Sequence, residues 1–237
     1  MGAGPVETKT DDGVVDWSKR QVRVVGVGTP RVVSNTGALT DGDLYQAARL
    51  DAERRIRNLL KSLPVGNGTT LGDASVAAPQ LHKSVVQLVA GATRHFSDGT
   101  IHIPAHASFD WVSVALGART KPAQKWADDA PTGLVLELTS AVEPTIQALL
   151  VSANGLTVSA GVQSDSVGGR GLAWVTTKAA ALAHPLAGER PLVLPAAIGS
   201  SGPGQIFRLN VEAASVFASA GIQGGVVVVT PPRGTSP

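Results

Sequence analysis

The stretch TDGDLYQAARLDAERRIRNLLKSL, residues 40–63, decides the fold of the first half of the chain. Thr40 and Asp43 have the spacing of a helix capping box, in which the threonine oxygen accepts a backbone N–H and the acid accepts the N–H of the cap residue. Pro64 and Gly66 end the helical pattern. Between these signals, apolar residues recur three or four positions apart, as on the buried face of an amphipathic helix: Leu44, Ala48, Ala52, Ile56, Leu59, Leu60 and Leu63.

A valine-rich strand is predicted before this helix. Residues 21–28, QVRVVGVG, are β-branched and largely alternate in polarity, and Thr29-Pro30 ends the run. We expect the apolar face of the helix to lie on the sheet that contains residues 22–27. Gly26 and Gly28 could open a dinucleotide-binding loop, but the third glycine position is Arg31 and no helix follows. We therefore interpret the two glycines as a glycine-rich bend after a strand.

The remainder of the first unit is predicted to be extended. Residues 85–90 form an apolar run, and Asp98-Gly99 is a strong hairpin signal between two extended runs. The return strand of that hairpin covers residues 101–109. Pro104 interrupts it, and because proline cannot donate to a sheet ladder, the strand is expected to be bent or to lie at an edge.

The second unit follows a polar stretch with two prolines, residues 117–132, which suits a linker between domains. The pattern then predicts these elements in order: a strand at 134–138, a hairpin of 148–152 with 156–160 around Asn154-Gly155, a short helix at 174–183 ended by His184-Pro185, an extended piece at 191–196, a helix at 211–220 capped by Asn210, and a strand at 226–230.

These elements predict an α+β fold of two small strand-rich domains. The first is a β-α-β-β unit, with room for one more strand, in which one main helix packs on an antiparallel or mixed sheet. The boundaries that we expect are a disordered lead at 1–18, the first domain at 19–117, a linker at 118–132, the second domain at 133–231 and a proline-rich tail at 232–237.

Composition excludes several classes of protein. The 237 residues contain no cysteine, which rules out disulfide scaffolds, cysteine-ligated zinc, iron–sulfur clusters and thiol nucleophiles. A hydrophobic content of 43% with 16% charged residues argues against a disordered chain. The 20 basic residues are nearly balanced by 18 acidic ones, so we expect no nucleic-acid partner.

Two groups of side chains invite a site. His95, Asp98, His102 and His106 are close in sequence, but Pro104 disturbs the strand register and no Glu or further His completes a ligand set, so we predict polar strand faces and no metal. His82 and His184 stand alone and are interpreted as surface or internally satisfied polar groups.

The second group is Asp51, Glu53, Arg54, Arg55 and Arg57. It includes the i,i+4 pair Glu53–Arg57 and is interpreted first as a solvated helix face, with a site for an anion or a partner as the alternative. The chain shows no phosphate-binding loop, no Gly-x-Ser-x-Gly elbow and no catalytic constellation. The sequence therefore predicts no enzyme, no catalytic residue and no cofactor.

Three segments, taken in order, resemble the lipoprotein-20-like family of bacterial cell-envelope proteins: QVRVVGVGTP at 21–30, AARLDAERRIRNLLKSL at 47–63 and VVQLVAGATRHFSDGTIHIPAHASFD at 85–110. Relatives in that family include the outer-membrane disk lipoprotein of some flagellar motors. The resemblance covers roughly residues 20–117. The segment TGLVLELTSAVEPTIQALLVSANGLTVSAG, residues 132–161, is also similar to the C-terminal half of longer envelope proteins in this group.

The resemblance implies a non-enzymatic, exported protein that assembles into rings or larger structures. We therefore expect a structural protein of the periplasm, outer membrane or cell surface that binds itself and other envelope proteins. Membrane contact is expected only through a lipid anchor. The printed chain has neither the lipid-bearing cysteine nor a signal segment, and we expect both to have been trimmed.

Two other functions stay open at this point. A ligand- or glycan-binding envelope module would be favoured by grouped exposed aromatic residues, and the chain carries Trp17, Trp111, Trp126 and Trp174. An enzyme with an unrecognised site is the third. Self-association is expected through the edges of weakly charged valine-rich strands at 22–27, 85–89 and 226–229, and through the return strand after Asp98-Gly99.

Overall fold

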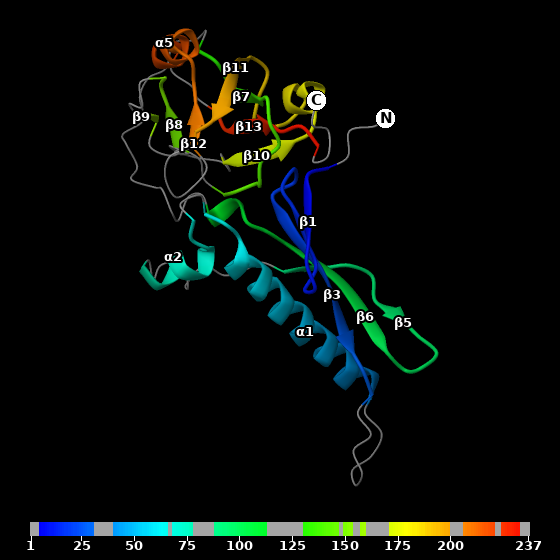
Figure 1. Ribbon diagram of the computed structural model, residues 1–237. Helices are drawn as coiled ribbons and strands as arrows, with labels where there is room; N and C mark the ends of the chain where they lie inside the picture. The colour runs from blue at the N-terminus through cyan, green and yellow to red at the C-terminus, as the bar shows by residue number, and fades with distance from the viewer. Residues whose placement is uncertain are drawn as a thin grey trace.

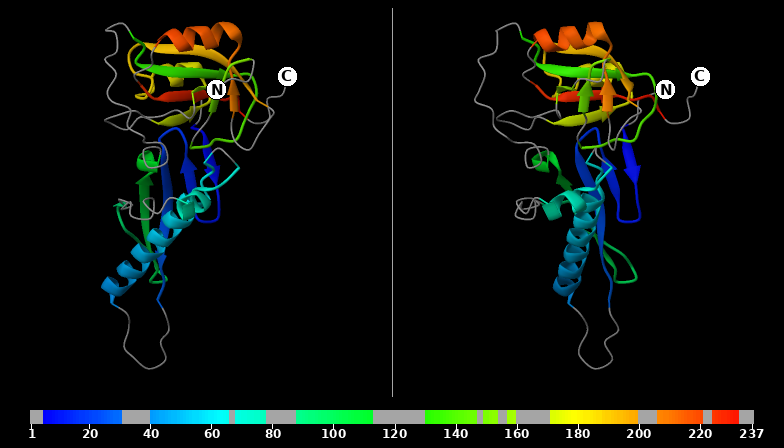
Figure 2. Two further views of the ribbon diagram at one scale, coloured as in Figure 1. Left: turned by 90° about the vertical axis from the view of Figure 1, so that its left-hand side faces the viewer. Right: turned by 60° about the vertical axis from the view of Figure 1, so that its left-hand side comes forward.

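The computed structural model describes residues 5–30, 40–65, 68–77, 88–112, 130–146, 149–153, 157–159, 171–199, 206–220 and 224–232. Within these residues the chain has an α+β fold with one six-stranded and one seven-stranded sheet. Figures 1 and 2 show the two sheets stacked end to end, with the ends of the first strands against the second sheet. The expected fold class is confirmed.

The first sheet is entirely antiparallel. Its strand order is β1-β2-β3-β6-β4, with β5 beside β4 on the same side of β6. Helices α1 and α2 belong to this domain. The elements, in chain order, are β1 (Glu7–Lys9), β2 (Val14–Asp16), β3 (Gln21–Gly28), α1 (Asp41–Ser62), α2 (Leu71–Ala77), β4 (Val89–Ala90), β5 (Arg94–His95) and β6 (Ile101–Ser108).

Helix α1 lies on one face of this sheet as predicted. Every residue of the predicted apolar face, from Leu44 to Leu63, is buried, and the capping box of Thr40 and Asp43 is formed. Gly26 and Gly28 make the packing possible: a Cβ atom on either would lie 2.1 Å from a carbonyl oxygen of α1. The prediction of a glycine-rich bend was wrong, because both glycines are part of β3 and let the helix backbone approach the strand.

The prediction of a disordered lead over residues 1–18 was wrong for the described residues from 5 onward. Strands β1 and β2 form a hairpin, and β2 pairs with β3. Val15 and Trp17 are buried, and Val6 packs against the same core. The polar composition of this segment suggested disorder, but the segment is ordered because β2 pairs with β3, a strand that the sequence did predict.

The expected sheet edge at Pro104 was also wrong. Strand β6 is interior, with β3 on one side and β4 and β5 on the other. The register of β6 shifts by one residue between its pairings with β4 and β5, so the neighbouring strand bulges opposite Pro104. Gly91 N–H donates to Pro104 O at 2.7 Å. In a strand, the backbone N and O atoms of one residue point toward the same neighbouring strand. The nitrogen of Pro104 therefore faces the bulge, where no partner strand needs an N–H donor from it.

The second sheet is mixed: β12 pairs antiparallel with β11, β8 pairs parallel with β12, and β9 pairs antiparallel with β8. Its order is β10-β13-β7-β11-β12-β8-β9, and the first four strands run parallel. The predicted hairpin of β8 and β9 forms, although its turn lies outside the described residues. The elements are β7 (Gly133–Leu138), β8 (Leu149–Val151), β9 (Thr157–Ser159), β10 (Leu172–Val175), α4 (Lys178–Leu182), β11 (Pro191–Ile198), β12 (Ile206–Arg208), α5 (Val211–Ala220) and β13 (Val226–Val229).

The helices of the second domain lie on opposite faces of its sheet. Ala181 of α4 packs with Val135 and Val227, whereas Ala213 of α5 belongs to the core that contains Leu134 and Val226. The helix predicted over 174–183 was too long: residues 172–175 form strand β10, and the helix begins at Lys178 after its cap Thr177. The predicted edge strands at 22–27 and 226–229 are both interior.

One continuous hydrophobic core joins the two halves. It runs from Trp17, Ile56 and Phe109 in the first half to Trp174 and Phe207 in the second. Most of the predicted linker lies outside the described residues. The interface is therefore packed like the interior of a domain, and the two halves share their stabilising contacts.

Candidate functional site

The histidine group does not come together as a site. His102 and His106 point to the same face of β6, and the His102 ring contacts the Phe96 ring at a tilt of 51°, with ring centroids 4.4 Å apart. Asp98 accepts the backbone N–H of Thr100 at 2.9 Å, and this hydrogen bond lowers the pKa of Asp98. In the described part of the chain, no three His, Asp or Glu side chains are close enough to hold a metal ion.

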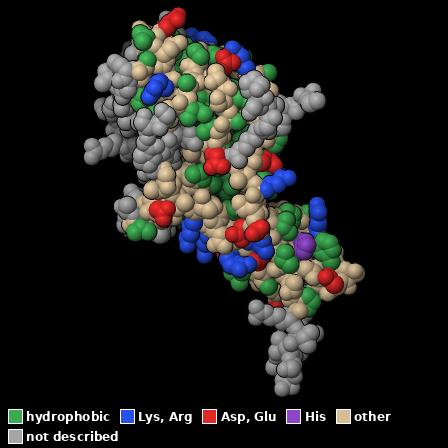
Figure 3. Space-filling view, viewed as in Figure 1, with side chains coloured by type: hydrophobic (Ala, Val, Ile, Leu, Met, Phe, Trp, Pro, Cys, Tyr) green, Lys and Arg blue, Asp and Glu red, His purple; other side chains and the backbone are tan. Residues whose placement is uncertain are grey.

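A different surface emerges on the same strands. No described element covers the face of the first sheet opposite α1, which we call the open sheet face. Register places Val25 opposite Pro104 and Val27 opposite His102 on this face. Val25 and Val89 on the strands and Phe96 in the β5–β6 turn are 45%, 49% and 46% exposed, so they present apolar side chains to solvent. Figure 3 shows hydrophobic side chains around a histidine near the β5–β6 hairpin.

The end of the open sheet face nearest the second domain is charged. Arg23 of β3 forms an ion pair with Glu7 of β1 across the intervening strand, and His106 lies directly opposite Arg23. Val89 also lies opposite His106, and Arg94 lies opposite His102. Apolar and basic side chains are therefore interspersed along the open sheet face.

A second candidate region is the junction between the domains, formed by the turn at residues 17–20. Trp174 N–H donates to Trp17 O at 3.3 Å, and the Ser18 hydroxyl donates to Trp174 O at 2.7 Å. Both bonds are made to β10, which is the outermost strand of the second sheet. The first domain therefore covers an edge that would otherwise be open to pairing.

His184 completes the junction on the other side of the turn. Its Nε2 atom lies 2.9 Å from Ser18 O, and Leu186 N–H donates to its Nδ1 at 3.1 Å. Because Nδ1 accepts, the hydrogen belongs on Nε2, which donates to Ser18 O. The prediction of a surface or satisfied histidine was thus correct about its hydrogen bonds, but its place between the domains was not foreseen.

Arg20 is a buried charge at the same junction. It is 4% exposed and forms an ion pair with Asp110 at 2.8 Å. Burial lowers the pKa of the Arg20 guanidinium, and the Asp110 carboxylate acts in the opposite sense. Its backbone φ of 54° lies in the left-handed region, which costs free energy in a non-glycine residue. A Cβ on Gly171 would lie 2.1 Å from the guanidinium, so a larger residue there would displace the end of the Arg20 side chain.

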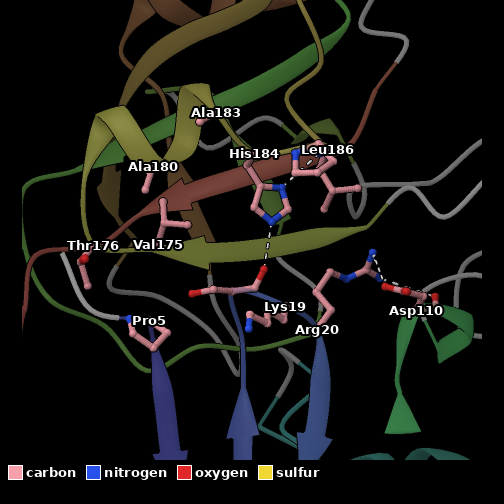
Figure 4. Close-up of a pocket in the computed structure, with 12 residues that line it drawn as sticks. Pro5, Lys19, Arg20, Asp110, Val175, Thr176, Ala180, Ala183, His184 and Leu186 are labelled. Carbon is pink, nitrogen blue, oxygen red and sulfur yellow. Dashed lines mark hydrogen bonds and ion pairs between the residues drawn. The ribbon is translucent and has the colours of Figure 1, made fainter. Parts of the chain in front are cut away.

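Two clefts flank the junction. One, of about 610 Å³, lies beside His184, Arg20 and Thr176 (Figure 4). The other, of about 710 Å³, lies between β1 and the segments around Glu143 and Thr230. In the first cleft, Arg20 and His184 already bind Asp110 and Ser18, so these polar groups serve the junction and are not directed at a ligand.

The charged group on α1 is more organised than a solvated face. Asp51 pairs with Arg54 and Arg55 and accepts Val27 N–H at 3.1 Å, which fastens the helix to β3. Partial burial acts to raise the pKa of Asp51, but hydrogen bonds from Arg55, Arg54 and Val27 together lower it. Glu53 pairs with Arg49 and with Arg57, which confirms the predicted Glu53–Arg57 pair.

Neither protein-family models nor curated proteins give a match to this chain. Among the described helices, none combines the length and the apolar character that crossing a membrane requires.

Proposed function

We propose that this chain is a non-enzymatic assembly protein of the bacterial cell envelope that binds copies of itself to form a ring or polymer. The observation that carries the proposal is the open sheet face, with its exposed Val25, Val89 and Phe96. Buried contact of this apolar surface with a second copy would release ordered water and stabilise the assembly.

The family resemblance of residues 20–117 supports the same proposal. Its three segments contain β3, the middle and end of α1, and the β5–β6 hairpin. A ring or polymer needs a contact between two different patches, so a second, complementary patch elsewhere on the chain is part of the proposal. Other envelope proteins are further proposed partners.

A substitution on the open sheet face tests the proposal. Val25→Glu places a charge in the middle of the apolar surface, and since Val25 is half-exposed the fold should tolerate it. Val211→Glu is the matched control, because Val211 is exposed on the first turn of α5, outside the open sheet face. We expect V25E to have a lower mass by light scattering than the wild type and to show mainly single copies in electron micrographs. V211E should give the same mass and the same particles as the wild type.

If the wild type and V25E form assemblies of equal mass, the open sheet face is not part of the assembly contact. If the wild type is monomeric at every concentration, the proposal of self-association is wrong.

A ligand- or glycan-binding envelope module is the second candidate, and the cleft between β1 and the segments around Glu143 and Thr230 favours it. If a cell-wall sugar binds there, thermal denaturation of the wild type with peptidoglycan fragments should show a higher melting temperature. Thr176 lines both clefts, so Thr176→Trp should abolish the increase. Unchanged melting temperatures across the sugars would exclude this candidate.

A further inference from the structure

The outward side of α1 carries a line of one leucine and three basic residues. Leu50, Arg54, Arg57 and Lys61 are spaced i, i+4, i+7 and i+11, which places them along one side of the helix. This line is opposite the one that buries Ala52 and Ile56. We call the four residues the α1 ridge. It spans about 17 Å at the usual helical rise.

The α1 ridge is positively charged even after its ion pairs are counted. Between residues 49 and 61, α1 has five basic side chains and two acidic ones. Each acid is shared: Asp51 by Arg54 and Arg55, Glu53 by Arg49 and Arg57.

The α1 ridge also remains accessible. Arg54 and Arg57 have side chains 66% and 68% exposed, and among the described residues Lys61 pairs with no carboxylate. Arg55 points toward the β1–β2 turn, where it donates to Asp11 O at 3.2 Å. Asp41 and Asp43 lie at the opposite end of the helix. Figure 3 shows the resulting gathering of Lys and Arg side chains over α1.

We propose that the α1 ridge docks on a membrane surface rich in anionic phospholipid. Arginine guanidinium groups match phosphate oxygens in geometry and charge. The ridge lines neither junction cleft and is convex, which suits a broad anionic surface better than a small ligand. Leu50, 64% exposed at one end, supplies an apolar side chain for the head-group boundary. The inference goes beyond the proposed function, because a single copy presents the whole ridge.

Vesicle co-sedimentation tests the docking. The wild type should bind vesicles of equal parts phosphatidylglycerol and phosphatidylcholine, should ignore phosphatidylcholine alone, and should dissociate at molar salt because the charges are screened. The triple variant Arg54→Gln, Arg57→Gln, Lys61→Gln should bind roughly 100-fold more weakly, given the contribution of each basic residue near an anionic surface. Arg54→Lys with Arg57→Lys keeps the charge and should retain binding.

A charge-matched control separates the ridge from overall net charge. Lys9→Gln, Arg190→Gln, Arg208→Gln removes three exposed basic residues elsewhere and should bind like the wild type. Equal loss in both triple variants, or equal binding to both kinds of vesicle, would overturn the proposal. So would retention on immobilised polyglutamate with no vesicle binding, which would indicate an acidic protein partner. Light-scattering mass of the ridge variant should match that of the wild type, so failure of docking is distinguishable from failure of self-association.

Discussion

At Gly26 the backbone of β3 comes very close to α1. A Cβ atom at this position would lie 2.1 Å from the carbonyl oxygen of Ala48 and 2.7 Å from the Cβ atom of Ala52. Gly26→Ala should therefore push the helix off the sheet and lower the free energy of unfolding by about 1–3 kcal/mol or more. Gly42→Ala is the control, because its Cβ would make only an ordinary 3.5 Å contact with Thr40. Chemical denaturation measures both, and equal stability of the two variants would contradict the close approach.

Burial on α1 gives a second prediction at the residue scale. Ile56 is 1% exposed in the core, so Ile56→Ala should lower the free energy of unfolding by about 2–5 kcal/mol. Arg54→Ala removes only an exposed ion pair, which typically contributes about 0–1 kcal/mol. Similar shifts in melting temperature for both variants would show that the buried face has been assigned incorrectly.

At the scale of elements, capping boxes start helices α1 and α2 of the first domain. Thr40 and Asp43 begin α1, and Thr70 and Asp73 make the same reciprocal hydrogen bonds at the start of α2. The first box was predicted from the sequence. The second has the same T-x-x-D spacing, but the helix after it is too short to show an apolar period, so the signal was missed.

These caps make stability depend on acid pH. Hydrogen bonds from the Thr40 hydroxyl and N–H lower the pKa of Asp43 from 3.8, and those from the Thr70 N–H and hydroxyl lower the pKa of Asp73. A carboxyl whose folded-state pKa is lowered stabilises fully above its unfolded pKa and loses that effect as the pH falls through the folded value. Between pH about 5 and about 2, Asp43→Asn with Asp73→Asn should therefore lose less stability than the wild type. Parallel curves from denaturation at each pH would refute this.

The elements predicted correctly share one property: their signals are local. The cap and apolar period of α1, the Asp98-Gly99 turn and the valine run of β13 each lie within one short segment. The order of residues 7–16 and the interior position of β6 depend on partners distant in sequence. The short strand β10 was read as part of a helix because the alanines after it dominate the local pattern.

At the scale of the whole molecule, the junction between the domains could not be predicted from the sequence, because it also depends on residues that are distant in sequence. The Ser18 hydroxyl and Trp174 O are separated by 156 positions, and no local motif connects them. The open sheet face was equally hidden, since only the strand register places Val25, Pro104 and His102 on one surface. The charged group on α1, in contrast, was visible in the sequence and needed the structure only to define its outward line.

The shared core predicts how the molecule unfolds. Because Trp17 and Phe109 pack in the same cluster as Trp174 and Phe207, neither half should keep its stability alone. We expect a single calorimetric transition, with calorimetric and van't Hoff enthalpies in agreement. Trp17→Ala should lower that one transition as a whole. Two separate transitions, of which only one responds to the substitution, would show that the halves are independent domains.

The central proposal is self-association, and the mass of the wild-type protein in solution tests it most directly. Light scattering over a wide range of protein concentration should give a mass that rises to a multiple of the 24.1 kDa chain, with rings or polymers visible at the highest concentrations. A constant mass of 24.1 kDa across the whole range, with single particles only, would contradict it.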